Sequence, residues 1–462
     1  MDVHFIPFNG RYLIYCPLKR LAFIGNQALI EYLRERATNP NATPAQTDIE
    51  SFLDQVGYWK SDVLPDAVVE PSALRPAMAV LLMTNRCNLA CTYCYAAAGS
   101  RPPVDMPWPM AQAMIDAAAD NARSNGESRF GVSFHGGGEP TLHWSVLTAA
   151  VAHARARALP CDISLASNGV WAPQKRDYIC RNLDSVTLSF DGVQSVQDAQ
   201  RPRRSRRGSF ETVLRSIHAL DAAEVKYGIR MTVTAAGIDK LPEGMRFLSN
   251  ETGVRAIQIE PSFTVARGVY ADPSAEDGRR FVAAFLQSAR IGSERDIFVS
   301  YSGARPWVIA RSFCLAPTQA LIATPEGRLV ACFEATGDGH PYAGEFTIGR
   351  VTPNGVEHDL AGYIKFQQRQ EARRAACTKC FCYWHCCGDC ASRAMVSSAP
   401  TSMRCQINRE ITQALIVGAI ERGGGVWTAS SDRIEKHMPS PHLKQNSLAA
   451  RPPSQGLGCE NL

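Results

Sequence analysis

The sequence has little of what marks a membrane or secreted protein. No apolar run in its 462 residues approaches the roughly 18 residues that a membrane-spanning helix needs. The N-terminal stretch MDVHFIPFNGRYLIY lacks the basic start, apolar segment and small-residue cleavage site of a signal peptide. Charge of one sign is also scarce, because Lys+Arg 49 and Asp+Glu 44 leave a formal net charge of +5. We therefore expect a cytoplasmic protein with no membrane and no nucleic acid among its partners.

Cysteine is the residue type that stands out. The chain has 16 cysteines, whereas its hydrophobic content of 45% and charged content of 20% are typical of an ordinary globular protein. Disulfides are rare in a reducing compartment, so clustered cysteines there usually bind metal or carry out redox chemistry. The length is sufficient for two or three domains. The sequence thus predicts a multidomain protein with metal or redox sites.

Four segments follow from the changes in pattern along the chain. Residues 1–75 read as a small α+β unit with strands at RYLIYCPL and RLAFIGN, followed by two helices. Residues 76–292 alternate strands with helices, and residues 293–425 are loop-rich and hold nine cysteines. Residues 426–462 are rich in Pro, Ser and Gln, which predicts a mostly disordered tail.

Six apolar runs in the second segment predict parallel strands at 78–84, 129–136, 162–169, 185–192, 228–235 and 256–262. Six strand-then-helix units predict an α/β fold with a parallel sheet, here a partial (β/α)6 TIM-like barrel. Polar and Gly-rich motifs follow these strands. In such barrels the chemistry lies at the carboxyl ends of the strands.

The first cysteine cluster, RCNLACTYCY, directly follows the first of these strands. Its spacing is C-x3-C-x2-C, formed by Cys87, Cys91 and Cys94. Three thiolates can hold three irons of a [4Fe–4S] cluster and leave the fourth iron open. An open iron is what S-adenosyl-L-methionine (SAM) needs in order to chelate through its amino and carboxylate groups. A zinc site or buried thiols are the alternatives.

These residues resemble the radical SAM superfamily, whose signature C-x3-C-x-aromatic-C places Tyr93 at the aromatic position. The resemblance covers roughly 78–290 and continues in three later motifs, HGGGEP, LASNG and LSFDG. It implies that SAM is reductively cleaved to a 5′-deoxyadenosyl radical. It also implies cofactor contacts at Tyr93, Gly137, Gly138, Glu139, Pro140, Ser167, Asn168, Ser189 and Asp191.

The later cysteines resemble the SPASM extension of radical SAM enzymes, a domain with two auxiliary iron–sulfur clusters that are expected to be [4Fe–4S]. In the order of that family, one cluster is implied at Cys314, Cys332 and Cys390. The other is implied at Cys377, Cys380, Cys386 and Cys405. Seven cysteines are one short of two four-thiolate clusters. Either the first cluster has an open iron, or another residue fills it, and the extra thiols Cys382 and Cys387 stay candidates. A zinc-ribbon-like domain is the alternative.

Four other cysteines and an arginine run have plainer interpretations. Cys16, Cys161 and Cys180 lie in apolar or helical contexts and are expected to be core thiols, whereas Cys459 lies in the tail. The run RPRRSRR (201–207) is interpreted as a solvated loop or as a site for an acidic peptide or the SAM carboxylate.

The resemblance implies a radical SAM oxidoreductase that matures a ribosomally made peptide by crosslink, thioether or epimer formation. Its partners are then a precursor peptide and a one-electron reductant such as flavodoxin or ferredoxin. Residues 1–75 resemble a leader-peptide recognition element, with a cap on the barrel as the alternative. The alternatives for the whole chain are an anaerobic sulfatase-maturating (formylglycine-forming) enzyme and a non-catalytic electron-transfer protein. The sulfatase maturases carry an Asp directly after the cysteine that matches Cys332, where this chain has Phe333. Glu334 and Glu260 are the candidate catalytic residues.

Overall fold

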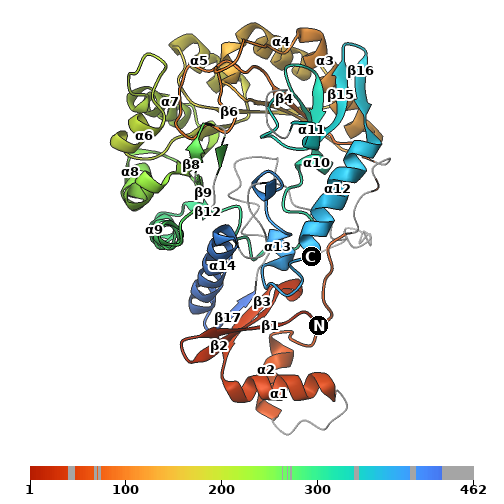
Figure 1. Cartoon of the computed structure of the whole chain (residues 1–462), viewed down its shortest axis with the longest axis vertical. Coiled ribbons are helices and arrows are strands. Elements are labelled where there is room, and N and C mark those ends of the chain that lie inside the picture. The colour runs from red at the N-terminus through yellow and green to blue at the C-terminus, as the bar shows by residue number, and fades with distance from the viewer. Residues whose placement is uncertain are drawn as a thin grey trace, which may run out of the picture.

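A computed structural model describes residues 1–39, 47–66, 70, 74–262, 264–267, 269–270, 273–337, 343–395 and 402–428. A long mixed sheet with its covering helices occupies the upper part of Figure 1, and a small sheet with α1 and α2 lies below it. No helix among the described residues is both long and apolar enough to cross a membrane.

The six predicted strands are confirmed as the parallel centre of the long sheet, in the order β9-β8-β7-β6-β5-β4. They are β4 (Met78–Leu82), β5 (Phe130–His135), β6 (Cys161–Ser167), β7 (Ser185–Ser189), β8 (Lys226–Val233) and β9 (Ala256–Pro261). The covering helices are α3 (Trp108–Ser124), α4 (Trp144–Arg155), α5 (Pro173–Asn182), α6 (Gln194–Gln200), α7 (Phe210–Ala222), α8 (Leu241–Glu251) and α9 (Ala275–Glu294). The interior positions of the strands are apolar because both faces of a parallel sheet are covered.

The loop-rich segment adds strands at both ends of this parallel centre. β12 (Phe298–Ser300) pairs in parallel with β9, and β13 (Leu321–Ala323) pairs in parallel with β4. β14 (Arg328–Val330), β15 (Thr347–Thr352) and β16 (Gly355–His358) continue antiparallel. Its helices are α10 (Ala316–Gln319), α11 (Ala343–Phe346), α12 (Leu360–Ala375), α13 (Tyr383–Cys386) and α14 (Met403–Arg422). The third segment therefore shares one sheet with the second.

The small sheet has the order β1-β2-β3-β17 and is antiparallel throughout. Its strands are β1 (His4–Phe8), β2 (Arg11–Cys16), β3 (Leu21–Gly25) and β17 (Val426–Thr428). One face packs on α1 (Gln27–Thr38) and α2 (Thr47–Gln55), and the other packs on Ile416, Val417 and Ile420 of α14. Two short strands, β10 (Thr264–Ala266) and β11 (Val269–Tyr270), pair with each other beyond β9.

Two details at the ends of the chain differ from the predictions. The strand predicted at RYLIYCPL is β2, which pairs on both sides, and the edges of the small sheet are β1, which was not predicted, and β17. Residues 426–428 were assigned to the tail but form β17, because Val426 and Trp427 pack on the small sheet. The rest of the predicted tail, with Cys459, lies outside the described residues.

Candidate metal centres

The loop between β4 and α3 brings the first three cysteines to the carboxyl edge of the sheet. Backbone N–H groups donate to two of the sulfurs, Leu89 to Cys87 Sγ at 3.4 Å and Ala98 to Cys94 Sγ at 3.4 Å. Burial raises the pKa of Cys87 to about 12 and also raises that of Cys91. Ionising buried thiols is costly unless a cation takes the place of the proton, so this donor set fits iron ligation.

The segment after α6 clamps this loop from outside. Ala90 N donates to Pro202 O at 2.8 Å, Thr92 N to Gln200 O at 2.9 Å, and Arg204 N to Asn88 O at 3.1 Å. The Arg204 side chain also donates from Nε to Cys87 O at 2.7 Å. The first part of the arginine run therefore braces the cysteine loop and is not merely a solvated loop.

The glycines after β5 allow two backbones to touch. Glu139 N donates to Arg86 O at 2.7 Å. A Cβ on Gly138 would lie 2.0 Å from that same carbonyl oxygen, and one on Gly137 would lie 2.6 Å from the Thr336 Cβ. Pro140 begins the 3-10 turn Pro140–Leu142. Glycine is needed at 138 because a side chain there would push the cysteine loop away.

The carboxylate of Glu139 joins the motifs after β5 and β6. It is 1% exposed and accepts hydrogen bonds from Ser167 Oγ at 2.8 Å and from Asn168 N at 2.9 Å. Asn168 Nδ2 in turn donates a hydrogen bond to Asn88 Oδ1 of the cysteine loop at 2.7 Å. The structure thus brings three of the predicted motifs into one hydrogen-bonded unit, and their role as SAM contacts stays a prediction.

Tyr93, Asp191 and Arg201 form a buried hydrogen-bonded cluster close to Cys91. Tyr93 Oη donates to Asp191 Oδ2 at 2.8 Å, and Arg201 Nη1 donates to Tyr93 Oη at 2.6 Å. Burial raises the pKa of Asp191, although Arg201 opposes that shift. Burial alone would lower the pKa of Arg201, but the charges at Cys91, Tyr93 and Asp191 raise it well above its usual value. Ser189 is the last residue of β7 and precedes this cluster.

Sequence reasoning missed that Arg201 is buried, since charge runs are usually exposed. Its relative exposure is 6%, whereas Arg204, Arg206 and Arg207 are exposed. The available signal was the segment QDAQRP, whose Gln200 also donates to Asp191 at 2.8 Å.

The first auxiliary set gathers beside β5. Burial, then the charges of Glu334, Cys390 and Cys314, raise the pKa of Cys332 well above its usual value. Glu334 accepts hydrogen bonds from Ser392 Oγ at 2.5 Å and Arg393 Nη2 at 3.3 Å. Phe333, the residue after Cys332, packs against His135 with the two ring centroids 5.1 Å apart.

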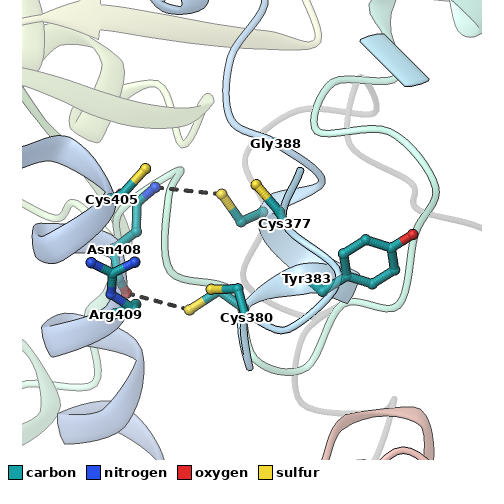
Figure 2. Close-up of a pocket in the computed structure, with 9 residues that line it drawn as sticks. Cys377, Cys380, Tyr383, Gly388, Cys405, Asn408 and Arg409 are labelled. Atoms are coloured by element: carbon teal, nitrogen blue, oxygen red, sulfur yellow. Dashed lines mark hydrogen bonds between the residues drawn. The ribbon is translucent and has the colours of Figure 1, made fainter. Parts of the chain in front are cut away.

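The second auxiliary set lines one pocket between α14 and the segment around α13 (Figure 2). The pocket residues include Cys377, Cys380, Cys382, Cys386 and Cys405. Asn408 Nδ2 donates to Cys386 Sγ at 3.5 Å, and a hydrogen bond from Cys382 is the main cause that lowers the pKa of Cys380 to about 6. A thiolate at Cys380 is a ready metal ligand, so this donor set also fits a metal.

The other described cysteines and Glu260 lie outside the pocket of the second auxiliary set. Cys387 donates to Ala310 O at 3.3 Å and is not among the pocket residues, while Cys16 and Cys161 are buried. Glu260 accepts from Ser302 N and Ser302 Oγ, both at 2.9 Å. A buried ion pair that the sequence did not reveal joins Arg404 Nε to Asp389 Oδ2 at 2.6 Å.

Comparison with known proteins decides the family of the central segment. The model of the radical SAM superfamily matches residues 81–245. The chain carries a radical SAM domain. The cofactors of that family are a [4Fe–4S] cluster and SAM, which the cysteine loop and the motifs around it suit. The cysteine-rich third segment is consistent with the auxiliary-cluster extension.

Two curated relatives extend the comparison. Fe-coproporphyrin III synthase of Methanosarcina barkeri is 27% identical over 243 residues, which cover 51% of this chain and only 58% of that protein. Mycofactocin maturase MftC of Mycolicibacterium smegmatis is 26% identical over 339 residues, covering 69% of this chain and 79% of that protein. The second alignment is the longer of the two.

Among solved structures, native anSMEcpe with bound AdoMet has a TM-score of 0.57 at 16% identity. The match covers 75% of this chain and 99% of that chain. This likeness confirms the predicted radical SAM fold.

Proposed function

We propose that this radical SAM protein is a maturase that modifies a ribosomally made peptide. The observation that carries the proposal is the presence of three cysteine sets, one after β4, one that includes Cys332 after β14 and one in the pocket beside α14, together with the long similarity to a maturase. In this proposal, Cys87, Cys91 and Cys94 hold the cluster that binds SAM, and the motifs joined by Glu139 contact SAM. The first auxiliary set, which includes Cys332, and the second, which includes Cys405, each hold an auxiliary cluster.

Glu334 is the better candidate for the group that handles a substrate proton. Its carboxylate is the charge that acts most strongly on Cys332, so it lies at the first auxiliary set. Glu260 instead directs both oxygens at Ser302. The Glu334 carboxylate is held in place by an ion pair with the Arg393 guanidinium at 3.3 Å.

Residues 1–75 are proposed to recruit the peptide at the edge strand β1. An edge strand presents unpaired N–H and C=O groups, and peptides bind such edges by strand addition. The sheet behind it packs on α14, the helix that also carries Cys405. A peptide held there is linked through one rigid helix to the second auxiliary set.

Formylglycine formation is the second candidate, and one observation counts against it. The residue after Cys332 is Phe333, whose ring packs on His135 and provides no carboxylate. The two reactions differ in product, because formylglycine carries an aldehyde that reacts with hydrazide probes.

The test uses the full chain purified anaerobically, SAM, dithionite and a short peptide encoded beside the gene. We expect 5′-deoxyadenosine together with a mass or stereochemical change in the peptide, and no hydrazide-reactive product. The Cys87→Ala variant is the control and should give neither product. An unmodified peptide alongside vigorous SAM cleavage would count against this substrate class, and a hydrazide-reactive product would favour the second candidate.

A further inference from the structure

The exposed part of the arginine run has no ion-pair partner. Arg204, Arg206 and Arg207 are exposed. Within the described residues, none of the three forms a salt bridge with a carboxylate, whereas many other surface arginines do, such as Arg129 with Asp162. Three like charges close in sequence without a salt bridge repel one another, so the arrangement suits a partner that supplies negative charge.

This basic surface lies directly against the loop that carries the first cysteine set. Leu89 and Arg203 form an antiparallel bridge, and the Arg204 side chain donates to Cys87 O at 2.7 Å and to Ala98 O at 2.6 Å. A protein bound over residues 204–207 would therefore lie close to Cys87, with the Arg204 side chain and the backbone of the cysteine loop between them. Electron transfer needs such closeness to the metal but does not need entry into the barrel.

The first auxiliary set lies on a different side from the basic surface. Phe333 and Thr336, which follow Cys332, lie against His135 and Gly137 at the end of β5, whereas the arginine run follows β7 and α6. A peptide that is modified between the SAM site and the first auxiliary set needs the β5 side. The basic surface therefore stays available for another partner.

We propose that Arg204, Arg206 and Arg207 form the docking surface for an acidic one-electron carrier protein that reduces the cluster at the Cys87 loop. The inference rests on the proposed radical SAM chemistry, in which one electron enters that cluster and passes to the SAM sulfonium, whose S–C5′ bond breaks to give methionine and the 5′-deoxyadenosyl radical. Transient electron-transfer contacts are small, and charges at their rim set the association rate and its salt dependence.

The experiment compares two electron sources on full-length protein with its clusters. The test variant is Arg206→Gln with Arg207→Gln, which leaves Arg204 and its contacts to the cysteine loop intact. The matched control is Arg279→Gln with Arg290→Gln, since both are exposed on α9 and equal in charge change. Formation of 5′-deoxyadenosine is measured with reduced flavodoxin as the carrier and, separately, with dithionite.

We expect the KM for flavodoxin to rise about tenfold or more in the test variant at low salt, because electrostatic steering contributes about 10–10³ to association. The difference should shrink toward 1 M salt, where the screening length is about 3 Å. The dithionite rate, the iron content and the control variant should match the wild type. An unchanged KM for flavodoxin overturns the inference. An equal loss of 5′-deoxyadenosine formation with dithionite in the test variant also overturns it. So does a raised KM for the peptide in that variant when dithionite is the reductant. Failure of the radical SAM chemistry on which the inference rests is distinct, because the wild type would then cleave no SAM with dithionite.

Discussion

Replacing Gly138 with alanine should disable the first metal centre while all three of its cysteines stay unchanged. The added Cβ would lie 2.0 Å from Arg86 O and 2.8 Å from the Arg86 and Asn85 carbonyl carbons, all backbone atoms of the cysteine loop. Real Cβ atoms keep at least 3.0 Å from such atoms, so the loop must shift by about 1 Å. Cys87 is the next residue, and its sulfur moves with it.

The expected cost has two parts. Overpacking of this kind costs about 1–3 kcal/mol. The hydrogen bond from Glu139 N to Arg86 O, now 2.7 Å, contributes about 0.5–1.5 kcal/mol that is lost when the carbonyl moves. The free energy of unfolding should therefore fall by about 1.5–4.5 kcal/mol, and iron should be lost preferentially from the first centre.

The assay is iron per chain, the spectrum of the reduced cluster and 5′-deoxyadenosine formation with dithionite. Gly344→Ala is the matched control, because a Cβ on this exposed glycine in α11 meets no atom within 4 Å. That variant should keep its iron and be unchanged or slightly more stable. Wild-type iron content and SAM cleavage in Gly138→Ala would refute the steric argument.

Four further outcomes follow from other contacts. Cys87→Ala should abolish SAM cleavage, whereas Cys314→Ala should mainly reduce peptide modification, as chromatography of 5′-deoxyadenosine and mass spectrometry of the peptide will report. Glu334→Gln should lower peptide modification by about 10²–10⁴-fold while SAM cleavage persists, and an equal loss in Glu260→Gln would contradict the assignment. Arg404→Met should lower the free energy of unfolding by about 3–5 kcal/mol, because it strands the Asp389 charge. Adding Asp389→Asn should restore part of that loss in urea melts, since Asn tolerates the φ of 75° at this position. Bound peptide should slow amide exchange in β1 and not in β2, which already pairs on both sides.

The parallel strands could be predicted from the sequence because each is a short apolar run followed by a polar or Gly-rich turn. β12 and β13 could not, because three-residue strands such as Phe298–Ser300 carry too little pattern to stand out. β1 was missed for a similar reason: HFIPF contains a proline, which is tolerated at a sheet edge but weakens the strand signal.

The site was predictable where cysteine spacing carried the information and not where tertiary contacts did. The predicted group of Cys377, Cys380, Cys386 and Cys405 lines one pocket in the structure. Cysteine spacing carries no information about Arg201 or Asp389, because their burial depends on partners distant in sequence. Tyr93 provides that partner across 108 residues, and Arg404 provides it for Asp389.

The continuity of the sheet bears on how the metal centres work together. β13 pairs with β4, the strand that leads into the Cys87 loop, and Cys332 follows two residues after β14. Both Cys332 and the Cys87 loop thus extend from one short stretch of hydrogen-bonded strands, and Gly137 after β5 lies close to Thr336 of the third segment. Because β12 pairs with β9 at the other end, residues 293–425 lack two of their strand partners when separated from the barrel. The auxiliary segment therefore pairs strands with the barrel at both ends of the parallel sheet, and the spacing between Cys332 and the Cys87 loop is set by β4, β13 and β14 and not by a linker.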